Sequence, residues 1–278
     1  MGATGTGKSR LSIDLASQFN GEIINSDKIQ VYKGLNIVTN KVTEEESCGV
    51  PHHLLGIIEP DADFSAQEFV HHATIATEAI THRARLPIIA GGSNSFIKAL
   101  VNDDTEFRSK FECCFLWVDV SIPVLHSAVT KRVDQMVRGG LVGIRRAIGV
   151  PEMDELFRNE DFVDDETRAK LLEGGIEKIK ANTRNLASRQ LKNILKLEEQ
   201  LQCQVHRLNA TEMFLKHGRE ADEAWEKLVA DPSTKIVGQF LCEDNNSIDF
   251  VPAPLHPIAA NGTNLGPAAA AIATTTHY

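Results

Sequence analysis

The chain has 278 residues, of which 42% are hydrophobic and 24% are charged, and its formal net charge is -9. This composition is typical of a globular protein that can bury a sizeable core, as one large α/β domain or one domain with a smaller insert. The acidic balance disfavours broad, non-specific nucleic-acid binding. Because no apolar stretch reaches the ~20 residues of a membrane-spanning helix, a soluble protein without a membrane partner is expected. The five cysteines include no C-x-x-C pair, which predicts neither a zinc site nor a redox motif and fits a reducing compartment.

The first motif starts at the second residue. Eight residues fit the P-loop pattern G-x-x-x-x-G-K-[ST]: Gly2, Ala3, Thr4, Gly5, Thr6, Gly7, Lys8 and Ser9. Several backbone N–H groups can then point at one anion, Lys8 supplies a mobile charge, and the Ser9 hydroxyl can hold Mg²⁺. The motif predicts a bound diphosphate or triphosphate without specifying the chemistry. Since a P-loop normally follows a buried strand and only Met1 precedes this one, we expect a longer natural chain, and no targeting peptide can be read.

Helices and strands are predicted to alternate from this motif onward. Leu11, Leu15 and Phe19 lie at helical spacing and predict a helix over 8–19. The next patterns predict a strand over 22–25, a helix over 66–83 capped by Ser65, and buried strands over 86–90 and 115–120. Such alternation is typical of an α/β fold, here a P-loop NTPase-like parallel sheet flanked by helices.

Charge divides the second half of the chain. Residues 152–166 are rich in acids, which predicts a solvated helical insert, whereas 178–197 contain six basic residues and no acid. A strand and a capped helix are predicted over 204–217. We therefore divide the chain into a P-loop core (1–140), a small acidic helical insert (141–182), a return to the core with the basic helix (183–250) and a flexible tail without Asp, Glu, Lys or Arg (251–278).

A second element, INSDKIQVYKGLNIVTNK at 24–41, follows the P-loop helix. Asp27 lies just past a predicted strand end, where ligands bind in α/β sheets, although on residue type alone a turn or helix-cap aspartate is the simpler interpretation. Together with GATGTGKS at 2–9, this element resembles the isopentenyltransferases, which include the tRNA dimethylallyltransferases and the adenylate enzymes of plants and some bacteria. Further similar stretches are PHHLLG at 51–56, LPIIAGGSNSFIKAL at 86–100, FLWVDV at 115–120, GIRRAIGVPE at 143–152 and NTRNLASRQL at 182–191.

The resemblance extends over residues 1–241, and HRLNATEMF at 206–214 and AWEKL at 224–228 are similar to the plant adenylate branch. The chain departs from the family pattern at the missing strand before the P-loop and at short joins near 102–110 and 141–143.

The resemblance implies transfer of a dimethylallyl group from its diphosphate to the exocyclic amine of adenine in ATP, ADP or AMP. Asp27 matches the family's general base. Lys8, the P-loop amides and Mg²⁺ on Ser9 would stabilise the diphosphate as it leaves, and Thr4 matches a threonine that donates to the bridging oxygen. Arg189 matches the arginine of an R-Q pair and would grip phosphate through its planar fork.

Other residues have weaker assignments. By resemblance, Ser93 and Asn94 would line the prenyl and adenine pocket, with a plain strand-to-helix turn as the alternative. Arg184 and Arg145 are further phosphate-binding candidates, and the extra phosphates of ADP or ATP would need cations such as Lys178, Lys180 or Lys192. The structural alternative for the basic stretch is a solvated helix face. His52 and His53 are interpreted as structural, since an adjacent pair without a third ligand is a poor metal site.

Three alternatives remain open at this stage. A P-loop small-molecule kinase would share the P-loop and Mg²⁺. A tRNA dimethylallyltransferase would use the same chemistry on another acceptor, but the acidic balance and the lack of a zinc-finger-like Cys/His module make tRNA an unlikely partner. A nucleotide-sensing protein with an inactive site would lack catalysis altogether. Nothing in the sequence specifies an oligomeric state, and plastid and cytoplasm are both expected locations.

Overall fold

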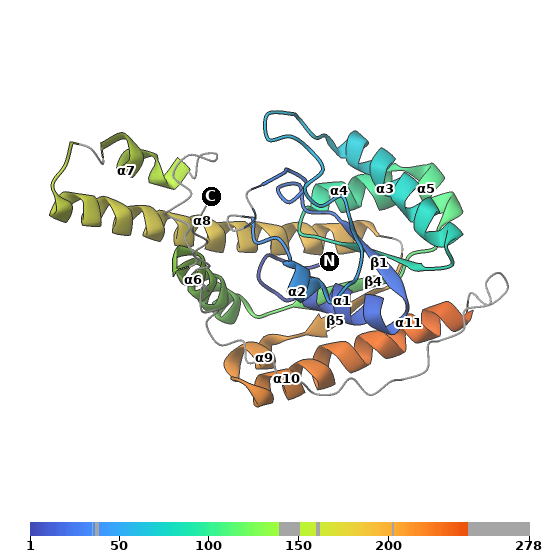
Figure 1. Ribbon diagram of the computed structural model, residues 1–278. Coiled ribbons are helices and arrows are strands. Elements are labelled where there is room, and N and C mark those ends of the chain that lie inside the picture. Colours follow the sequence, from blue (N-terminus) through green and yellow to red (C-terminus); the bar gives the residue numbers. More distant parts are fainter. Residues whose placement is uncertain (35, 37–38, 139–150, 160–161, 202, 244–278) are drawn as a thin grey trace, which may run out of the picture.

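The structure is a computed structural model, and it describes residues 1–278 except 35, 37–38, 139–150, 160–161, 202 and 244–278. Parallel strands form the centre of the body, with helices on both sides, and an arm of two helices extends from it (Figure 1). The predicted class, a P-loop-like parallel sheet flanked by helices, is confirmed.

The strands form two parallel groups. In the first, Gly21–Asn25 (β1) lies between His52–His53 (β2) and Leu86–Ala90 (β3), with Ile23 opposite both His52 and Ile88. In the second, Phe115–Asp119 (β4) pairs in register with Val205–Asn209 (β5). Asp27 and the Gly91-Gly92 pair therefore follow the carboxyl ends of adjacent strands, where a parallel sheet presents its ligand-binding edge.

The first helices form where the sequence predicts them. Lys8–Gln18 (α1) starts at the P-loop, and Ala66–His82 (α3) begins with a reciprocal capping box between Ser65 and Glu68. The other helical segments of the core are Glu44–Ser47 (α2), Asn94–Lys98 (α4), Ala99–Asp103 (η1), Thr105–Lys110 (α5), Thr211–Leu215 (α9), Arg219–Trp225 (α10), Glu226–Ala230 (η4) and Asp231–Glu243 (α11).

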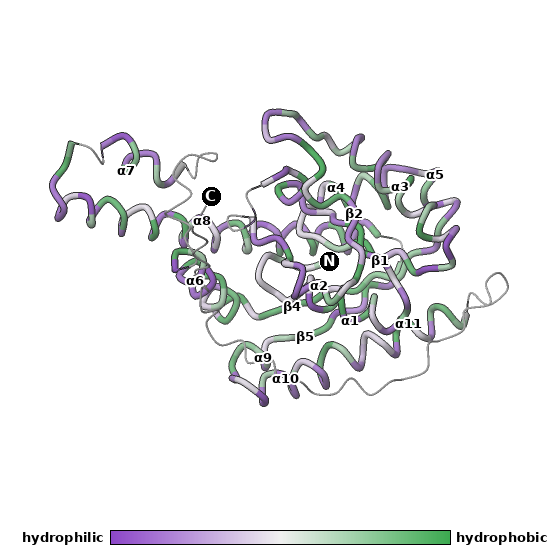
Figure 2. Tube along the Cα trace, in the orientation of Figure 1, coloured by the Kyte–Doolittle hydropathy of each residue, from purple (hydrophilic) through white to green (hydrophobic). Residues whose placement is uncertain are grey.

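Two apolar clusters hold the body together. One joins α1, β4, α10 and α11 around Val118, Trp225 and Val237, and the other joins β1, α3, α4 and α5 around Phe69 and Phe96. Figure 2 shows hydrophobic residues along the strands, and hydrophobic residues alternating with hydrophilic ones along the helices around them. Burial of these faces provides the main stabilisation of the fold.

The arm consists of Asp154–Asn159 (α7) and the outer part of Asp165–Gln200 (α8), preceded by the short turn Pro151–Met153 (η3). It has a small core of its own, in which Met153, Leu156 and Ile179 pack against Val133 of Ile122–Arg138 (α6). Helix α8 is continuous across residues 182 and 183, so the predicted insert and the basic stretch share one helix. The predicted tail, 251–278, lies outside the described residues.

Across the part of the chain that the structure describes, no helix combines the length and apolar character needed to cross a membrane.

Candidate functional site

The P-loop closes over the N-terminus of α1. Gly7 is the residue before the helix and has a φ of 95°, and a Cβ added there would lie 2.7 Å from the Trp225 ring. Glycine is therefore required both by the left-handed backbone and by the close approach of the indole. The Trp225 indole N–H donates to Asp14 at 2.8 Å, so the plant-like AWEKL stretch packs directly beneath the phosphate-binding motif.

Lys8 points back into the loop. Its ammonium donates to the Ala3 carbonyl at 2.7 Å. Burial lowers the pKa of Lys8, the negative charge of Asp27 partly offsets this, and the positive charge of Arg132 lowers it again, so that the resulting pKa is about 8. An anion that binds in the loop would stabilise the charged form of Lys8, because its negative charge compensates for the hydration that the ammonium has lost.

Asp27 is held by the turn after β1. One of its carboxylate oxygens accepts from the Ile29 N–H at 3.0 Å, and its own N–H donates to the Asn25 side chain at 3.1 Å. The other oxygen faces Gly92, where an added Cβ would lie 3.5 Å from it. This turn leaves a carboxylate oxygen directed at the loop after β3, as the position of Asp27 in the sequence predicts.

The Gly91-Gly92-Ser93-Asn94 turn lies against the Asp27 turn. The Lys28 N–H donates to the Ser93 hydroxyl at 2.9 Å, so Ser93 joins the two turns instead of capping α4. Asn94 is buried, and its amide donates to the Gln190 carbonyl at 3.1 Å. A Cβ at Gly91 would lie only 2.3 Å from the Ser26 carbonyl carbon, so this contact excludes any larger residue.

Two functional candidates escaped the sequence analysis, namely Arg132 and Gln190. The Arg132 guanidinium donates to the Thr4 hydroxyl at 2.8 Å, and the Gln190 side chain accepts from the Thr4 N–H at 2.7 Å while donating to the Gly92 carbonyl at 3.0 Å. Burial lowers the pKa of Arg132, and Asp27 raises it. The only available signal for Gln190 was its place in the R-Q pair; Arg132, on α6, stood outside every motif.

Of the three arginines that the sequence suggested for phosphate binding, the two that the structure describes form no hydrogen bond with the P-loop. Arg189 is exposed and takes part in no hydrogen bond or ion pair with another described residue. Adjacent residues on a helix point about 100° apart, so Gln190 contacts the P-loop while Arg189 beside it points in another direction and is exposed. Arg184 donates to the Thr130 hydroxyl on α6 at 3.2 Å. Thr130 precedes Arg132 by two residues on the same helix. Arg145 lies outside the described residues. The roles of all three remain predictions.

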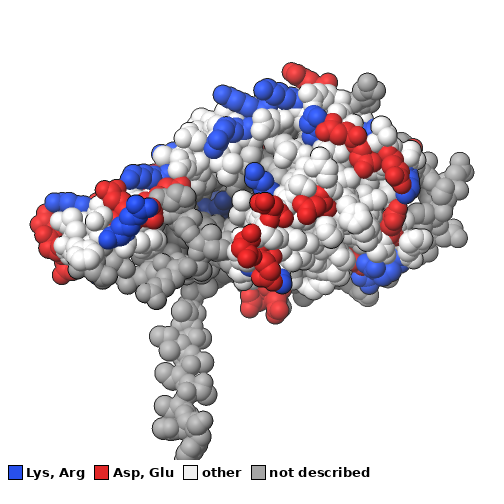
Figure 3. All heavy atoms as spheres, turned by 90° about the horizontal axis from the view of Figure 1, so that it is seen from above, with Lys and Arg blue, Asp and Glu red and all other residues white. Residues whose placement is uncertain are grey.

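The lysines suggested for extra phosphates are largely compensated. Lys178 pairs with Glu155 at 3.3 Å, and Lys180 pairs with Asp134 at 2.8 Å. Figure 3 shows acidic and basic side chains side by side over the arm. The basic stretch is thus in part a solvated face whose charges are balanced by acids from neighbouring helices, while Lys192 is exposed.

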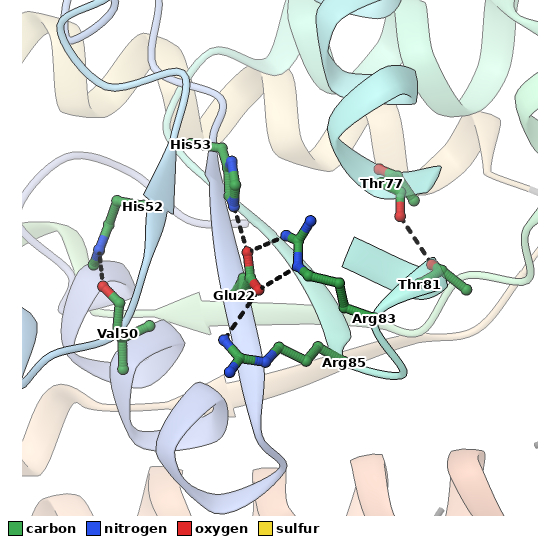
Figure 4. Close-up of polar contacts among 8 residues, drawn as sticks. All are labelled: Glu22, Val50, His52, His53, Thr77, Thr81, Arg83 and Arg85. Atoms are coloured by element: carbon green, nitrogen blue, oxygen red, sulfur yellow. Dashed lines mark hydrogen bonds and ion pairs between the residues drawn. The ribbon is translucent and has the colours of Figure 1, made fainter. Parts of the chain in front are cut away.

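His52 and His53 form β2 and lie beside Ile23 and Ile24 of β1. His53 contacts Glu22 at 2.5 Å, and His52 contacts the Val50 carbonyl at 2.8 Å (Figure 4). Among the described residues there is no cluster of three or more His, Cys, Asp or Glu that could hold a metal ion. The structural interpretation of the histidines fits these contacts.

Unpaired polar atoms gather around the P-loop. Within the described residues, four buried side-chain atoms have no hydrogen-bond partner, and three of them belong to Ser26, Asn94 and Arg132. Buried polar groups without partners are rare and costly. Their concentration between the P-loop, the Asp27 turn and α6 marks the place where a polar ligand would be stabilised.

Comparisons with known proteins agree with this geometry. The model of the IPP transferase family matches residues 30–110. Adenylate isopentenyltransferase 5, chloroplastic, of Arabidopsis thaliana is 59% identical over 259 residues, which cover 87% of this chain and 78% of that protein. Adenylate isopentenyltransferase 7, mitochondrial, of the same plant is 52% identical over 263 residues, which cover 88% and 80%.

A solved structure of a eukaryotic dimethylallyltransferase acting on tRNA is similar in fold, with a TM-score of 0.69 and 23% identity over 90% of this chain and 80% of that one. Its low identity supports the fold alone, whereas the plant proteins are close in sequence over most of their length. The chain therefore belongs to the adenylate isopentenyltransferases, a family of prenyl-transferring enzymes.

Proposed function

We propose that this protein transfers the dimethylallyl group of dimethylallyl diphosphate to the exocyclic amine of adenine in ATP or ADP. The products are the prenylated nucleotide and diphosphate, as in the first step of cytokinin biosynthesis. The observation that carries the proposal is the convergence of the Asp27 carboxylate, the buried Lys8 ammonium and the Arg132 guanidinium on one P-loop.

The diphosphate would bind in the P-loop. Lys8 and Arg132 are half-buried cations that already contact the loop, and both would exchange their hydrogen bonds to Ala3 and Thr4 for bonds to phosphate oxygens. Charge grows on the diphosphate as the bond from oxygen to the first prenyl carbon breaks. Fixed cations and N–H donors therefore bind the transition state more tightly than the ground state.

Asp27 would act as the general base. The adenine amine forms a bond to the prenyl carbon while the carbon–oxygen bond to diphosphate breaks, and the amine proton passes to the carboxylate. The amine is a weak nucleophile because its lone pair is delocalised into the ring, so removal of the proton favours attack. The Ile29 N–H bond to one Asp27 oxygen leaves the other oxygen available for this transfer.

Mg²⁺ is the proposed metal ion. Ser9 follows Lys8 directly and its side chain is exposed, and magnesium in phosphate sites is usually held by one or two protein oxygens together with phosphates and water. The lack of a carboxylate cluster among the described residues fits this kind of site. When bound, the ion would neutralise charge on the diphosphate. The Ser9 hydroxyl would orient it.

The alternatives are less well supported. A small-molecule kinase would use the P-loop for a nucleotide, but it would have no need for a base directed at the Gly92 turn. A tRNA acceptor shares the donor chemistry, yet the chain has a formal net charge of -9 and Lys178 and Lys180 are already ion-paired. A long polyanion needs many unpaired cations, so a single free nucleotide is the better acceptor.

A competition assay tests the acceptor. The enzyme is incubated with dimethylallyl diphosphate and Mg²⁺, with AMP, ADP and ATP in turn and with ATP against an unmodified anticodon stem-loop at equal concentration. Mass analysis should find prenylated ADP or ATP and little prenylated RNA. If the RNA takes most of the label, the acceptor assignment is wrong while the donor site stands; if ATP is hydrolysed without prenylation, the kinase alternative replaces both.

The compartment is also a proposal. Relatives at 59% and 52% identity are named chloroplastic and mitochondrial, so we propose an organellar location, with the plastid first and the cytoplasm as the alternative. Imaging a fluorescent fusion of the product of the complete gene would test it.

A further inference from the structure

One side chain joins the P-loop to the turn after β3. Gln190 lies on α8, and its carboxamide oxygen accepts from the Thr4 N–H at 2.7 Å while its carboxamide nitrogen donates to the Gly92 carbonyl at 3.0 Å. The backbone carbonyl of Gln190 also accepts from the buried Asn94 amide at 3.1 Å. Gln190 therefore connects three segments of the chain that only the tertiary structure brings together.

The two partners of this bridge specify a carboxamide. The Thr4 N–H is a donor and the Gly92 C=O is an acceptor, so the side chain between them must offer one group of each kind. Glutamine carries both on one planar group, whereas an ionised carboxylate offers acceptors alone and lysine or arginine offers donors alone. Because the partners differ, they also fix which end of the carboxamide faces which loop. Hydrogen bonding, and not packing alone, thus accounts for glutamine at this position.

The bridge lies beside the proposed general base. A Cβ added at the buried Gly92 would lie 2.7 Å from the Gln190 amide nitrogen and 3.5 Å from an Asp27 carboxylate oxygen. The carboxamide and the carboxylate therefore meet over the same glycine. At the other end of the bridge, the Thr4 hydroxyl accepts from Arg132 on α6. Two long helices thus hold Thr4, one through its N–H and the other through its side chain.

We propose that Gln190 is a positioning residue for prenyl transfer, which sets the distance between the donor diphosphate in the P-loop and the acceptor amine at Asp27. The inference rests on the proposed function, in which one loop binds the leaving group and the neighbouring turn takes the proton. The prenyl carbon and the amine nitrogen meet correctly only if these two segments keep a fixed separation. Gln190 fixes it with one hydrogen bond to the P-loop and one to the turn that adjoins Asp27. A displacement of about 1 Å can slow a reaction ~10²-fold.

Two other roles for Gln190 would have different signatures. If its carboxamide bound the diphosphate directly, its removal would weaken donor binding together with the rate. If it served the fold alone, its removal would lower stability but would leave the rate of each folded molecule unchanged. A positioning role predicts a third pattern, in which kcat falls while donor affinity and the fold are retained.

Gln190→Met tests these patterns, because methionine is similar in length but forms neither hydrogen bond of the bridge. With dimethylallyl diphosphate and ATP, kcat per folded molecule should fall by ~10–10²-fold, while the donor Kd should change by less than about threefold. Isothermal titration without an acceptor measures this Kd, and circular dichroism measures the folded fraction. Gln200→Met is the matched control, since Gln200 is exposed on the same helix, and it should leave both quantities unchanged.

Amide hydrogen exchange provides a readout that does not depend on activity. In Gln190→Met the Thr4 N–H loses its acceptor, so exchange over residues 2–7 should become faster, whereas exchange over 66–82 of α3 should not change. Gln190→Glu is a second variant for the case that methionine prevents folding. It keeps an acceptor for the Thr4 N–H but places an oxygen against the Gly92 carbonyl, so kcat should again fall by about tenfold or more.

The outcomes separate this inference from the proposed function. A folded Gln190→Met or Gln190→Glu protein with the kcat of wild type would overturn the positioning role alone. A fall in donor affinity by the same factor as kcat in Gln190→Met would overturn it as well, in favour of direct binding of the diphosphate. If the wild-type protein transfers no prenyl group to any acceptor, the proposed function fails and the positioning role fails with it.

Discussion

The two ends of β1 both bury charge, but they do so in opposite ways. At its start, the Glu22 side chain is only 3% exposed and accepts hydrogen bonds from Arg83 at 2.7 Å and Arg85 at 3.1 Å, with His53 beside it (Figure 4). Beyond its other end, Lys8 and Arg132 are half-buried near a single carboxylate, Asp27, and the Arg132 Nε has no partner among the described residues.

The difference separates a structural charge cluster from a functional one. Burial alone would raise the pKa of Glu22, but the hydrogen bonds and charges of Arg83 and His53 outweigh it and lower this pKa to about 2. At the P-loop, by contrast, burial prevails and lowers the pKa of Lys8 to about 8. A cluster whose partners are all present is costly to break by removing one of them, and one with excess half-buried cations is arranged for an incoming anion.

The largest expected effect comes from removing the carboxylate at the functional end. Asp27→Ala should lower kcat by ~10²–10⁴-fold, the usual contribution of a general base, with a much smaller change in nucleotide affinity. Steady-state kinetics and equilibrium binding measure the two quantities. Asp27→Asn, which keeps the side-chain shape, should be similarly slow. A kcat within threefold of wild type for either variant would show that Asp27 is not the base.

Removal of the Lys8 ammonium from the P-loop should have the second-largest effect. Lys8→Ala should lower kcat/KM by ~10²–10³-fold, the range for one group that stabilises developing charge, and should weaken dimethylallyl diphosphate binding at the same time. Isothermal titration with the donor and initial rates provide the measurements. Unchanged donor affinity and rate would contradict the P-loop assignment.

Two arginines distinguish the buried site from the exposed helix face. Arg132→Lys should lower kcat/KM by about tenfold or more, because an ammonium does not reproduce the guanidinium fork. Arg189→Lys is the matched comparison, since the resemblance predicts a comparable loss while its exposure in the structure predicts little. A larger loss for Arg189 than for Arg132 would show that the exposed Arg189 side chain contacts the substrate.

At the structural end, Glu22→Gln should lower the free energy of unfolding by ~3 kcal/mol, as expected when one partner of a buried charge cluster is removed, while kcat changes little. Urea unfolding measures the first quantity. Glu59→Gln is a suitable control because the Lys33–Glu59 pair is exposed, and such pairs contribute at most about 1 kcal/mol. Equal losses in the two variants would remove the distinction between the ends of β1.

The lowered pKa of Glu22 also predicts that the protein loses stability at acid pH. The folded pKa of Glu22, about 2, is below the ordinary value of 4.5, so its contribution is fully present above pH 4.5 and is lost as the pH falls toward 2. The shift corresponds to about 3 kcal/mol. Unfolding measured in this range should be less pH-dependent for Glu22→Gln than for wild type; parallel curves would contradict the assignment.

The smallest effect concerns alkaline pH at the functional end. Lys8 loses its proton as the pH rises through about 8, so donor affinity should fall above pH 8 by up to about tenfold per pH unit. Below pH 8, Lys8 is charged and adds no slope. Lys8→Ala should not show this fall in donor affinity. The comparison therefore distinguishes deprotonation of Lys8 from ionisation of the diphosphate, which would affect both proteins alike.

The sequence alone determined the parallel α/β fold, the P-loop and the position of Asp27, because each depends on residues close together in the chain: a strand, the turn after it and the helix that follows. Only the tertiary structure decided which other side chains join them. Arg132 reaches Thr4 across 128 residues and Gln190 reaches it across 186, through the packing of α6 and α8 against the P-loop. Local pattern does not specify such contacts. It also does not decide which of two adjacent residues faces the site, and the rotation of α8 directed Gln190 inward and left Arg189 exposed.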